Sequence, residues 1–213
     1  TGGEADLTEE DLEVRERELS TACATVLLID VSHSMTLYGE DRITPAKRVA
    51  LALTELTLTR FPKDTIDVVL FGDEAEVVPL ERLPYVSNGP YHTNTRAGLM
   101  RAQDILLRRK GMNRQIVMLT DGKPSAIHDG GGIYKNPFGL DPLIVNKTLE
   151  EAVRCRRRGI RVTTFMLTSD PYLQRFVERF TEACRGKAWF ASSARLESFV
   201  MVDFIRNRRR RVR

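Results

Sequence analysis

The 213-residue sequence contains no apolar run close to the roughly 20 residues that a membrane-spanning helix requires. No signal-peptide pattern opens it, and it has no G-x-x-x-x-G-K-[ST] loop, so that route to nucleotide binding is absent. It has only three cysteines, Cys23, Cys155 and Cys184, without the spacing of metal ligands. They stand in apolar stretches, so we expect buried, reduced thiols and a cytoplasmic protein. The first residue is Thr1 and not Met, and we expect a piece of a longer protein.

A net positive charge is also absent outside one short segment. The formal net charge is +4, but residues 206–213 contribute six arginines, so the rest of the chain carries −2. Such a run can bind phosphates or acidic partners, or it can be the solvated end of a terminal helix. No aromatic residues that could stack on bases accompany it, which disfavours nucleic-acid binding.

Apolar, β-rich runs alternate with amphipathic helical patterns along most of the chain, as in an α/β domain. Between residues 65 and 80 two strands follow each other with only a short turn, which predicts a hairpin and one antiparallel edge strand. We therefore expect a doubly wound, Rossmann-like sandwich: a six-stranded, mostly parallel sheet with helices on both faces. The expected strands are 23–31, 65–71, 75–80, 114–120, 160–167 and 187–191. We expect five helices. The first has Thr44 as N-cap followed by Pro45, the second includes Leu99–Leu107, and the third ends at Gly159. The fourth begins at Asp170-Pro171, and the fifth begins near residue 194.

Polar side chains follow several of these strands. Asp30 ends the first strand, Ser32 and Ser34 come next, Thr93 precedes the second major helix, and Asp121 follows the fourth strand. In open α/β sheets ligands bind at the carboxyl ends of the strands, so we expect these five side chains to converge. Two carboxylates and three hydroxyls are hard oxygen ligands that suit Mg²⁺ or Mn²⁺. The like charges of the two aspartates would repel, and a cation would offset this repulsion.

Asp30-Val31-Ser32-His33-Ser34, Thr93 and Thr120-Asp121-Gly122 together resemble the metal-ion-dependent adhesion site (MIDAS) of von Willebrand factor A (vWA) domains. The resemblance covers roughly residues 20–205. It implies Asp30, Ser32, Ser34, Thr93 and Asp121 as the metal site, with an open position for an acidic side chain of a partner. Thr95 lies two positions from Thr93 and leaves that assignment open.

The runs "TVLLIDVSHSM", "QIVMLTDGKPSA" and "GIRVTTFML" resemble the intracellular bacterial branch of the family. Its members typically work with AAA+ ATPases of the MoxR or magnesium-chelatase kind, so the resemblance implies such a partner. With the acidic composition of the first residues and the arginine run at the end, we expect an acidic linker or N-terminal extension (1–20), a vWA domain (21–205) and an arginine-rich tail (206–213). We expect a metal-dependent protein-interaction module and no enzyme.

Four alternatives accompany this interpretation. A magnesium-dependent phosphatase of the haloacid dehalogenase type needs an acid two residues after its aspartate, where this chain has Ser32. The serines lie in no G-x-S-x-G elbow, which disfavours serine hydrolysis. Asp30 and Asp121 could also be simple caps of backbone amides. A zinc site could be built from three histidines, His33, His92 and His128, but no cysteine accompanies them.

The segment 122–142 is too long and glycine-rich for an ordinary connection, so we expect either a functional loop beside the metal or a mobile insertion. Tyr134 and Phe138 are its candidates for contact with a partner.

Overall fold

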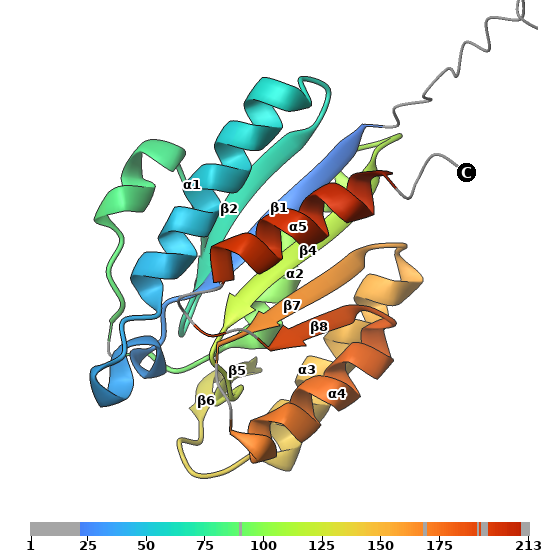
Figure 1. The fold of residues 1–213 in the computed structure, drawn as a ribbon. Coiled ribbons are helices and arrows are strands. Elements are labelled where there is room, and N and C mark those ends of the chain that lie inside the picture. Colours follow the sequence, from blue (N-terminus) through green and yellow to red (C-terminus); the bar gives the residue numbers. More distant parts are fainter. Residues whose placement is uncertain (1–21, 90, 168–169, 191, 193–195, 210–213) are drawn as a thin grey trace, which may run out of the picture.

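A computed structural model describes residues 22–89, 91–167, 170–190, 192 and 196–209. A six-stranded sheet in the order β3-β2-β1-β4-β7-β8 forms the centre, and among these strands β3 alone runs antiparallel to its neighbour (Figure 1). The expected fold class is confirmed.

The strands of this sheet are β1 (Cys23–Asp30), β2 (Thr65–Phe71), β3 (Ala75–Val78), β4 (Asn113–Thr120), β7 (Arg161–Met166) and β8 (Lys187–Phe190). The helices are α1 (Ile43–Arg60), α2 (Thr95–Leu107), α3 (Pro142–Arg157), α4 (Pro171–Cys184) and α5 (Leu196–Arg209), with 3₁₀ helices η2 (His33–Gly39) and η3 (Leu80–Tyr85).

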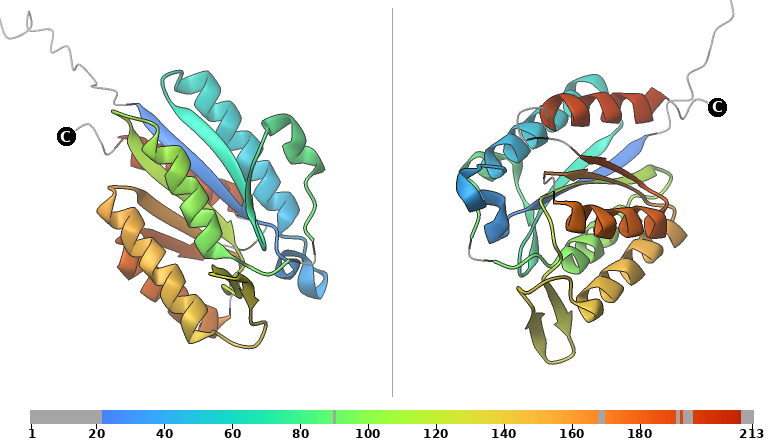
Figure 2. Two further views of the ribbon diagram at one scale, coloured as in Figure 1. Left: turned by 180° about the vertical axis from the view of Figure 1, so that it is seen from behind. Right: turned by 60° about the horizontal axis from the view of Figure 1, so that its bottom comes forward.

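Helices cover both faces of the sheet, as the views from behind and from below show (Figure 2). The four β1 residues Val26–Ile29 are fully buried and alternate between two cores. Leu27 and Ile29 pack with α1 and α5 on one face, and Val26 and Leu28 pack with α2, α3 and α4 on the other. A strand buried on both faces needs a continuous apolar run, which is what this part of the sequence has.

The predicted helix boundaries are mostly confirmed by their caps. Asp170 accepts the amide of Tyr172 at the start of α4, and Gly159 follows α3 with φ +67°. The prediction of Thr44 as N-cap of α1 is wrong. The helix begins at Ile43, and the side chain of Asp41 accepts the Thr44 amide at 2.9 Å. Asp41 supplies the oxygen that the sequence argument assigned to Thr44.

Segment 122–142 is the second departure from the sequence-based expectation. It contains a hairpin of β5 (Ala126–Asp129) and β6 (Gly132–Lys135), in which Ala126 and Ile127 are fully buried. Gly130 and Gly132 have positive φ values at the turn, a backbone conformation that glycine adopts most readily. The segment therefore contains a hairpin whose first strand begins with two buried residues, and it is not a loop throughout.

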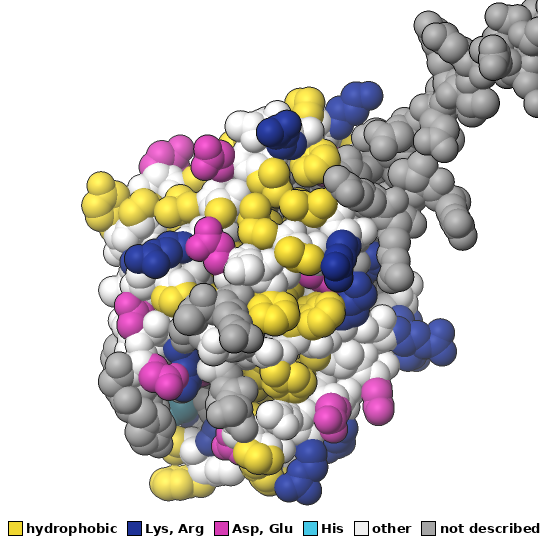
Figure 3. Space-filling model, in the orientation of Figure 1, with side chains coloured by type: hydrophobic (Ala, Val, Ile, Leu, Met, Phe, Trp, Pro, Cys, Tyr) yellow, Lys and Arg dark blue, Asp and Glu magenta, His cyan; other side chains and the backbone are white. Residues whose placement is uncertain are grey.

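The expected N-terminal extension and C-terminal tail lie wholly or partly outside the residues that the structure describes. The acidic extension 1–20 lies entirely outside them, whereas α5 continues to Arg209 and so includes the first part of the arginine-rich tail. Within the described part of the chain, no helix is long and apolar enough to cross a membrane. Figure 3 shows hydrophobic side chains on the face where α5 and β8 lie. Trp189 of β8 and Phe199 of α5 are exposed hydrophobic residues whose ring centroids are 6.4 Å apart.

Candidate functional site

The candidate site lies where β1 and β4 end side by side. From β1 the chain adds β2 and β3 on one side, and β4, β7 and β8 lie on the other side. This is the topological switch point, where open α/β sheets place their ligands. Asp30 is the last residue of β1, and Asp121 directly follows the last residue of β4.

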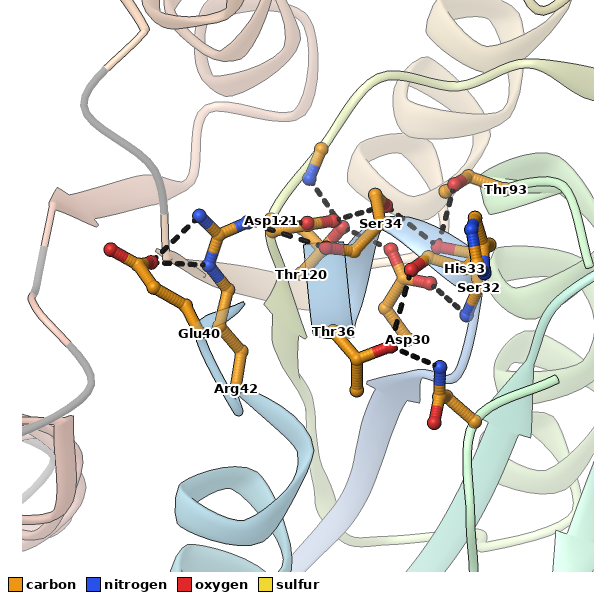
Figure 4. Close-up of polar contacts among 12 residues, drawn as sticks. Asp30, Ser32, His33, Ser34, Thr36, Glu40, Arg42, Thr93, Thr120 and Asp121 are labelled. Atoms are coloured by element: carbon orange, nitrogen blue, oxygen red, sulfur yellow. Dashed lines mark hydrogen bonds and ion pairs between the residues drawn. The ribbon is translucent and has the colours of Figure 1, made fainter. Parts of the chain in front are cut away.

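The three predicted hydroxyls and Asp121 form a continuous hydrogen-bonded chain (Figure 4). Thr93 Oγ1 donates to Ser32 Oγ at 3.0 Å, and Ser34 Oγ donates to Asp121 Oδ1 at 2.7 Å. Ser32 and Ser34 hydroxyl oxygens are 3.1 Å apart. Since Ser34 gives its one hydrogen to Asp121, Ser32 must be the donor to Ser34. The hydroxyl hydrogens therefore run in one direction toward the carboxylate, and each hydroxyl oxygen keeps a lone pair outside these bonds.

Asp30 lies beneath this chain and is completely buried. Its Oδ1 accepts the Ser32 amide at 2.9 Å, and its Oδ2 accepts the hydroxyl of Thr120 at 2.6 Å. Burial raises the pKa of Asp30 from 3.8 to about 7; the charge of Asp121 adds to the rise, and hydrogen bonds from Ser32 and Thr120 oppose it. Asp30 thus orients the Ser32 loop while it holds a carboxyl group that burial makes hard to ionise.

Asp121 is also buried, with a side chain that is only 2% exposed. Burial raises its pKa, and the hydrogen bond from Ser34 and the positive charge of Arg42 act against that rise. The expected proximity of the two aspartates is confirmed, because the charge of Asp121 contributes to the raised pKa of Asp30.

Sequence reasoning missed Arg42 and Glu40. Arg42 Nη1 donates to Asp121 Oδ2 at 2.7 Å, and its Nε and Nη2 donate to Glu40 Oε2 at 3.1 and 2.8 Å. An arginine eight residues after Ser34 carries no pattern that would place it beside Asp121. Thr120 was also missed as an Asp30 partner, although its position before Asp121 at a strand end was a usable signal.

Thr93, and not Thr95, faces the other hydroxyls. Thr93 contacts Ser32, whereas Thr95 is the buried first residue of α2. The segment is held from both sides: the Thr93 amide donates to Ser125 Oγ at 3.0 Å, and the Ser125 amide donates back to the Thr93 carbonyl at 2.9 Å. Asn94 caps α2 by accepting the amide of Ala97.

A cavity of about 920 Å³ opens over this cluster. Ser32, Ser34, Thr93 and Asp121 line it, and Asp30 does not, in keeping with its burial. The walls come from Arg42, Tyr91, Lys123, Ser125, Pro137 and Tyr172, among other residues. Four of the five predicted ligands therefore line the cavity, although Ser32, Thr93 and Asp121 are nearly buried, and the fifth lies behind them.

The β5–β6 hairpin flanks the cavity through its connections. Lys123 Nζ donates to the carbonyl of Pro137, and Asp141 Oδ2 accepts Tyr134 Oη at 3.0 Å and Asn136 Nδ2 at 2.9 Å. Phe138 is 84% exposed, and Tyr134 is 40% exposed. Both side chains named as contact candidates thus reach solvent.

The histidines do not gather into a site. The His33 side chain is exposed, His92 lies 3.6 Å from Asp73, and His128 pairs with Glu74 at 3.0 Å. No group of three or more His, Cys, Asp or Glu side chains arranged to hold a metal occurs in the described part of the chain. The donors at the β1–β4 edge are two carboxylates and three hydroxyls, which fit a hard ion such as Mg²⁺ or Mn²⁺ better than zinc.

Comparison with known proteins identifies the family. Residues 23–205 match the family described as "Rv0959-like protein, vWA domain". An uncharacterised protein of Mycobacterium tuberculosis (strain H37Rv) is 34% identical over 212 residues, which cover 96% of this chain and 31% of that protein. The chain thus spans about a third of the length of the curated relatives that it matches.

Solved structures show the same fold at low identity. The PilB minor pilin of Streptococcus sanguinis superposes with a TM-score of 0.72 at 14% identity, over 89% of this chain and 62% of the pilin. The SpRpn10 VWA domain superposes with a TM-score of 0.61 at 15% identity, over 84% and 93% of the two chains. From the family match and the sheet topology together, the chain belongs to the vWA domain family, in its Rv0959-like group.

Proposed function

We propose that this vWA domain is a metal-dependent protein-interaction module. In this proposal Asp30, Ser32, Ser34, Thr93 and Asp121 hold one Mg²⁺ or Mn²⁺ as a MIDAS. The observation that carries the proposal is the one-directional hydroxyl chain from Thr93 to Asp121, which leaves oxygen lone pairs at the floor of a cavity.

The donor set agrees with such an ion in charge as well as in chemistry. Two buried carboxylates lie close enough for the charge of Asp121 to raise the pKa of Asp30. A guanidinium already contacts Asp121, so this edge of the sheet attracts positive charge. The bound cation would supply a Lewis-acidic centre for an Asp or Glu of a partner protein.

The protein's own residues would set how a partner approaches. Thr120 and the Ser32 amide hold Asp30 in place, and Ser125 holds the Thr93 backbone, so the oxygen cluster is positioned before any ligand arrives. Tyr91 and Tyr172 offer aromatic surface on the cavity walls for the residues around a partner's carboxylate.

We propose no turnover at this site. The hydroxyls of Ser32 and Ser34 are committed toward Asp121, and no histidine is hydrogen-bonded to either of them among the described residues. The haloacid dehalogenase alternative lacks its second acid, because Ser32 stands at that position and hydrogen-bonds to other hydroxyls. Simple capping alone does not account for Asp121, whose side-chain partners are a hydroxyl and a guanidinium.

The family resemblance extends the proposal to the partner. Members of the intracellular bacterial branch typically act with AAA+ ATPases of the MoxR or magnesium-chelatase kind, so we propose such an ATPase as the partner, in the cytoplasm. The curated relatives are about three times as long as the matched segment, and the remainder of such a protein would contribute to that assembly.

The first test is metal binding. Isothermal titration calorimetry with Mg²⁺ and Mn²⁺ should show one site in the wild type and a much weaker one in Ser34→Ala, which loses one oxygen of the cluster. Thr36→Ala is the matched control, because its hydroxyl lies in the same 3₁₀ helix but contacts Asn88 instead of the cluster. A folded wild type that binds neither ion would contradict the metal site.

The second test is partner binding. A partner captured from lysate should bind the wild type and lose binding in EDTA and in Ser34→Ala. Removal of residues 208–213 should have little effect, because the carboxyl ends of the strands and not the tail carry the site. Binding that survives EDTA and Ser34→Ala but fails on removal of the tail would overturn the proposal in favour of the basic tail. Phosphatase activity that disappears in Asp30→Asn would overturn the absence of turnover.

A further inference from the structure

Arg42 lies between the candidate metal site and an exposed acidic side chain. The residue directly precedes α1, and its guanidinium bridges two carboxylates (Figure 4). One edge binds Glu40 through Nε and Nη2, and Nη1 binds Asp121 Oδ2 at 2.7 Å. The Glu40 side chain is 61% exposed, whereas that of Asp121 is 2% exposed, so the guanidinium spans from solvent to the buried site.

The contact with Asp121 has a clear electrostatic role. Asp121 is buried beside Asp30, and a buried carboxylate without a counter-charge is strongly disfavoured. Among the described residues, Arg42 is the only cationic side chain with an ion pair to either aspartate. Lys123 lines the same cavity, but its Nζ donates to the carbonyl of Pro137.

A divalent cation at the hydroxyl cluster would meet this positive charge. The guanidinium bonds one oxygen of Asp121 and Ser34 bonds the other, so the cation and Nη1 would share a single carboxylate. The positive charges of the cation and the guanidinium would repel each other, and this repulsion would weaken the binding of both to Asp121. The cation and the guanidinium are therefore competitors for Asp121.

We propose that Arg42 is a built-in competitor of the divalent cation, which neutralises Asp121 in the metal-free domain and is retained by Glu40 when a cation binds. The inference rests on the proposed metal site. Only the Nη1 contact must be given up, because the two bonds to Glu40 can persist. The Ser34 carbonyl already accepts from Nη1 at 3.4 Å, and this hydrogen bond can persist as well.

The consequence is that the ion pair between Arg42 and Asp121 affects both the stability of the metal-free domain and its affinity for the cation. The ion pair keeps the metal-free site stable, and it lowers the affinity for the cation by the free energy needed to displace the guanidinium. A weaker competitor should therefore give a domain that binds metal more tightly but is less stable without it. These two effects have opposite signs, which separates the proposal from a purely structural role for Arg42.

The experiment measures Mg²⁺ and Mn²⁺ affinity by calorimetry and melting temperature in EDTA. Arg42→Gln should bind both ions about tenfold more tightly than the wild type, as expected when one adjacent positive charge is removed. It should melt at a lower temperature in EDTA, and the deficit should shrink as cation is added. Glu40→Gln should bind the ions more weakly, because the guanidinium then keeps only Asp121 as its charged partner.

Two further variants keep the test interpretable. Arg109→Gln removes an ion pair to Asp67 that lies outside the cavity and should change neither affinity nor metal dependence. If Arg42→Gln does not fold in EDTA, Arg42→Lys serves instead: it keeps the charge beside Asp121 but cannot bridge both carboxylates through a planar fork, so like Glu40→Gln it should bind the ions more weakly than the wild type.

The outcomes distinguish the two proposals. Tighter binding in Arg42→Gln with lower stability in EDTA supports the competitor. Unchanged or weaker binding in Arg42→Gln, with normal binding in the wild type, overturns the competitor and leaves the metal site standing. Absence of binding in both overturns both proposals.

Discussion

Replacement of Asp30 by Asn should remove most of the pH dependence of the metal-free domain. Asp30 is completely buried, and burial and the neighbouring Asp121 raise its pKa from 3.8 to about 7. Between these two values the folded protein holds the proton more tightly than the unfolded chain does. Stability in EDTA is therefore full below about pH 4 and falls as the pH rises toward 7.

The size of the effect follows from the shift. Each pKa unit corresponds to about 1.4 kcal/mol, so raising the pH from 5 to 8 should lower the free energy of unfolding by up to about 3 kcal/mol. For a domain of this length that is about 5 to 10 °C in melting temperature. The raised pKa of Asp121 acts in the same direction, so a small slope should remain in Asp30→Asn.

The variant should differ from the wild type in a pH-dependent way. At pH 8 Asp30→Asn should be the more stable protein, because it buries no charge. At pH 5 the two proteins should be about equally stable, because protonated Asp30, like Asn, offers one acceptor oxygen and one donor to Ser32 and Thr120. Addition of Mg²⁺ at pH 8 should stabilise the wild type and leave the variant nearly unchanged.

Urea denaturation at pH 5, 6, 7 and 8 in EDTA measures these differences. Wild-type stability that is flat or increases over this range would refute the reasoning. An Asp30→Asn slope equal to that of the wild type would show that other groups cause the pH dependence.

Three further predictions address the remaining parts of the structure. Asp121→Asn should weaken Mg²⁺ binding in calorimetry, yet its melting temperature in EDTA should change little, because loss of the Arg42 ion pair and relief of the repulsion with Asp30 oppose each other; a loss of about 10 °C or more would make Asp121 a structural residue. Asp141→Ala removes the N-cap of α3 and should lower the free energy of unfolding by about 1–2 kcal/mol in urea titrations, whereas Asp141→Asn should retain most of it. The Cys155 thiol is fully buried and burial raises its pKa to about 12, so thiol reagents should modify it only after unfolding; rapid labelling of the native protein would contradict this.

The sequence alone was sufficient for the architecture and for most of the candidate site. Continuous apolar runs such as Val26–Ile29 predict strands buried on both faces, and the short turn before Ala75 predicts the antiparallel edge strand. Asp30 and Asp121 could be assigned to one edge because parallel strands end at the same edge of a sheet. These inferences depend on local periodicity and on strand direction, which neighbouring residues encode.

Segment 122–142 shows where local signals were present but underused. Ala126-Ile127 before a run of glycines, with Ile133-Tyr134 after it, is compatible with a hairpin, and the structure forms one. The length and glycine content of the segment favoured a loop instead. Burial of Ala126 and Ile127 against the rest of the domain decided for the hairpin, and burial of that kind depends on distant residues.

Only the tertiary structure showed that Arg42 contacts Asp121 and that Thr93, and not Thr95, faces the other hydroxyls. Arg42 and Asp121 are 79 residues apart in sequence, and their contact depends on how η2 returns toward the sheet before α1 begins. Thr93 faces Ser32 because the Ser125 backbone and hydroxyl hold its segment in place. Spacing along one chain predicts which residues share an edge of the sheet, but the pairing of charges within that edge is set by packing between segments that no local pattern relates.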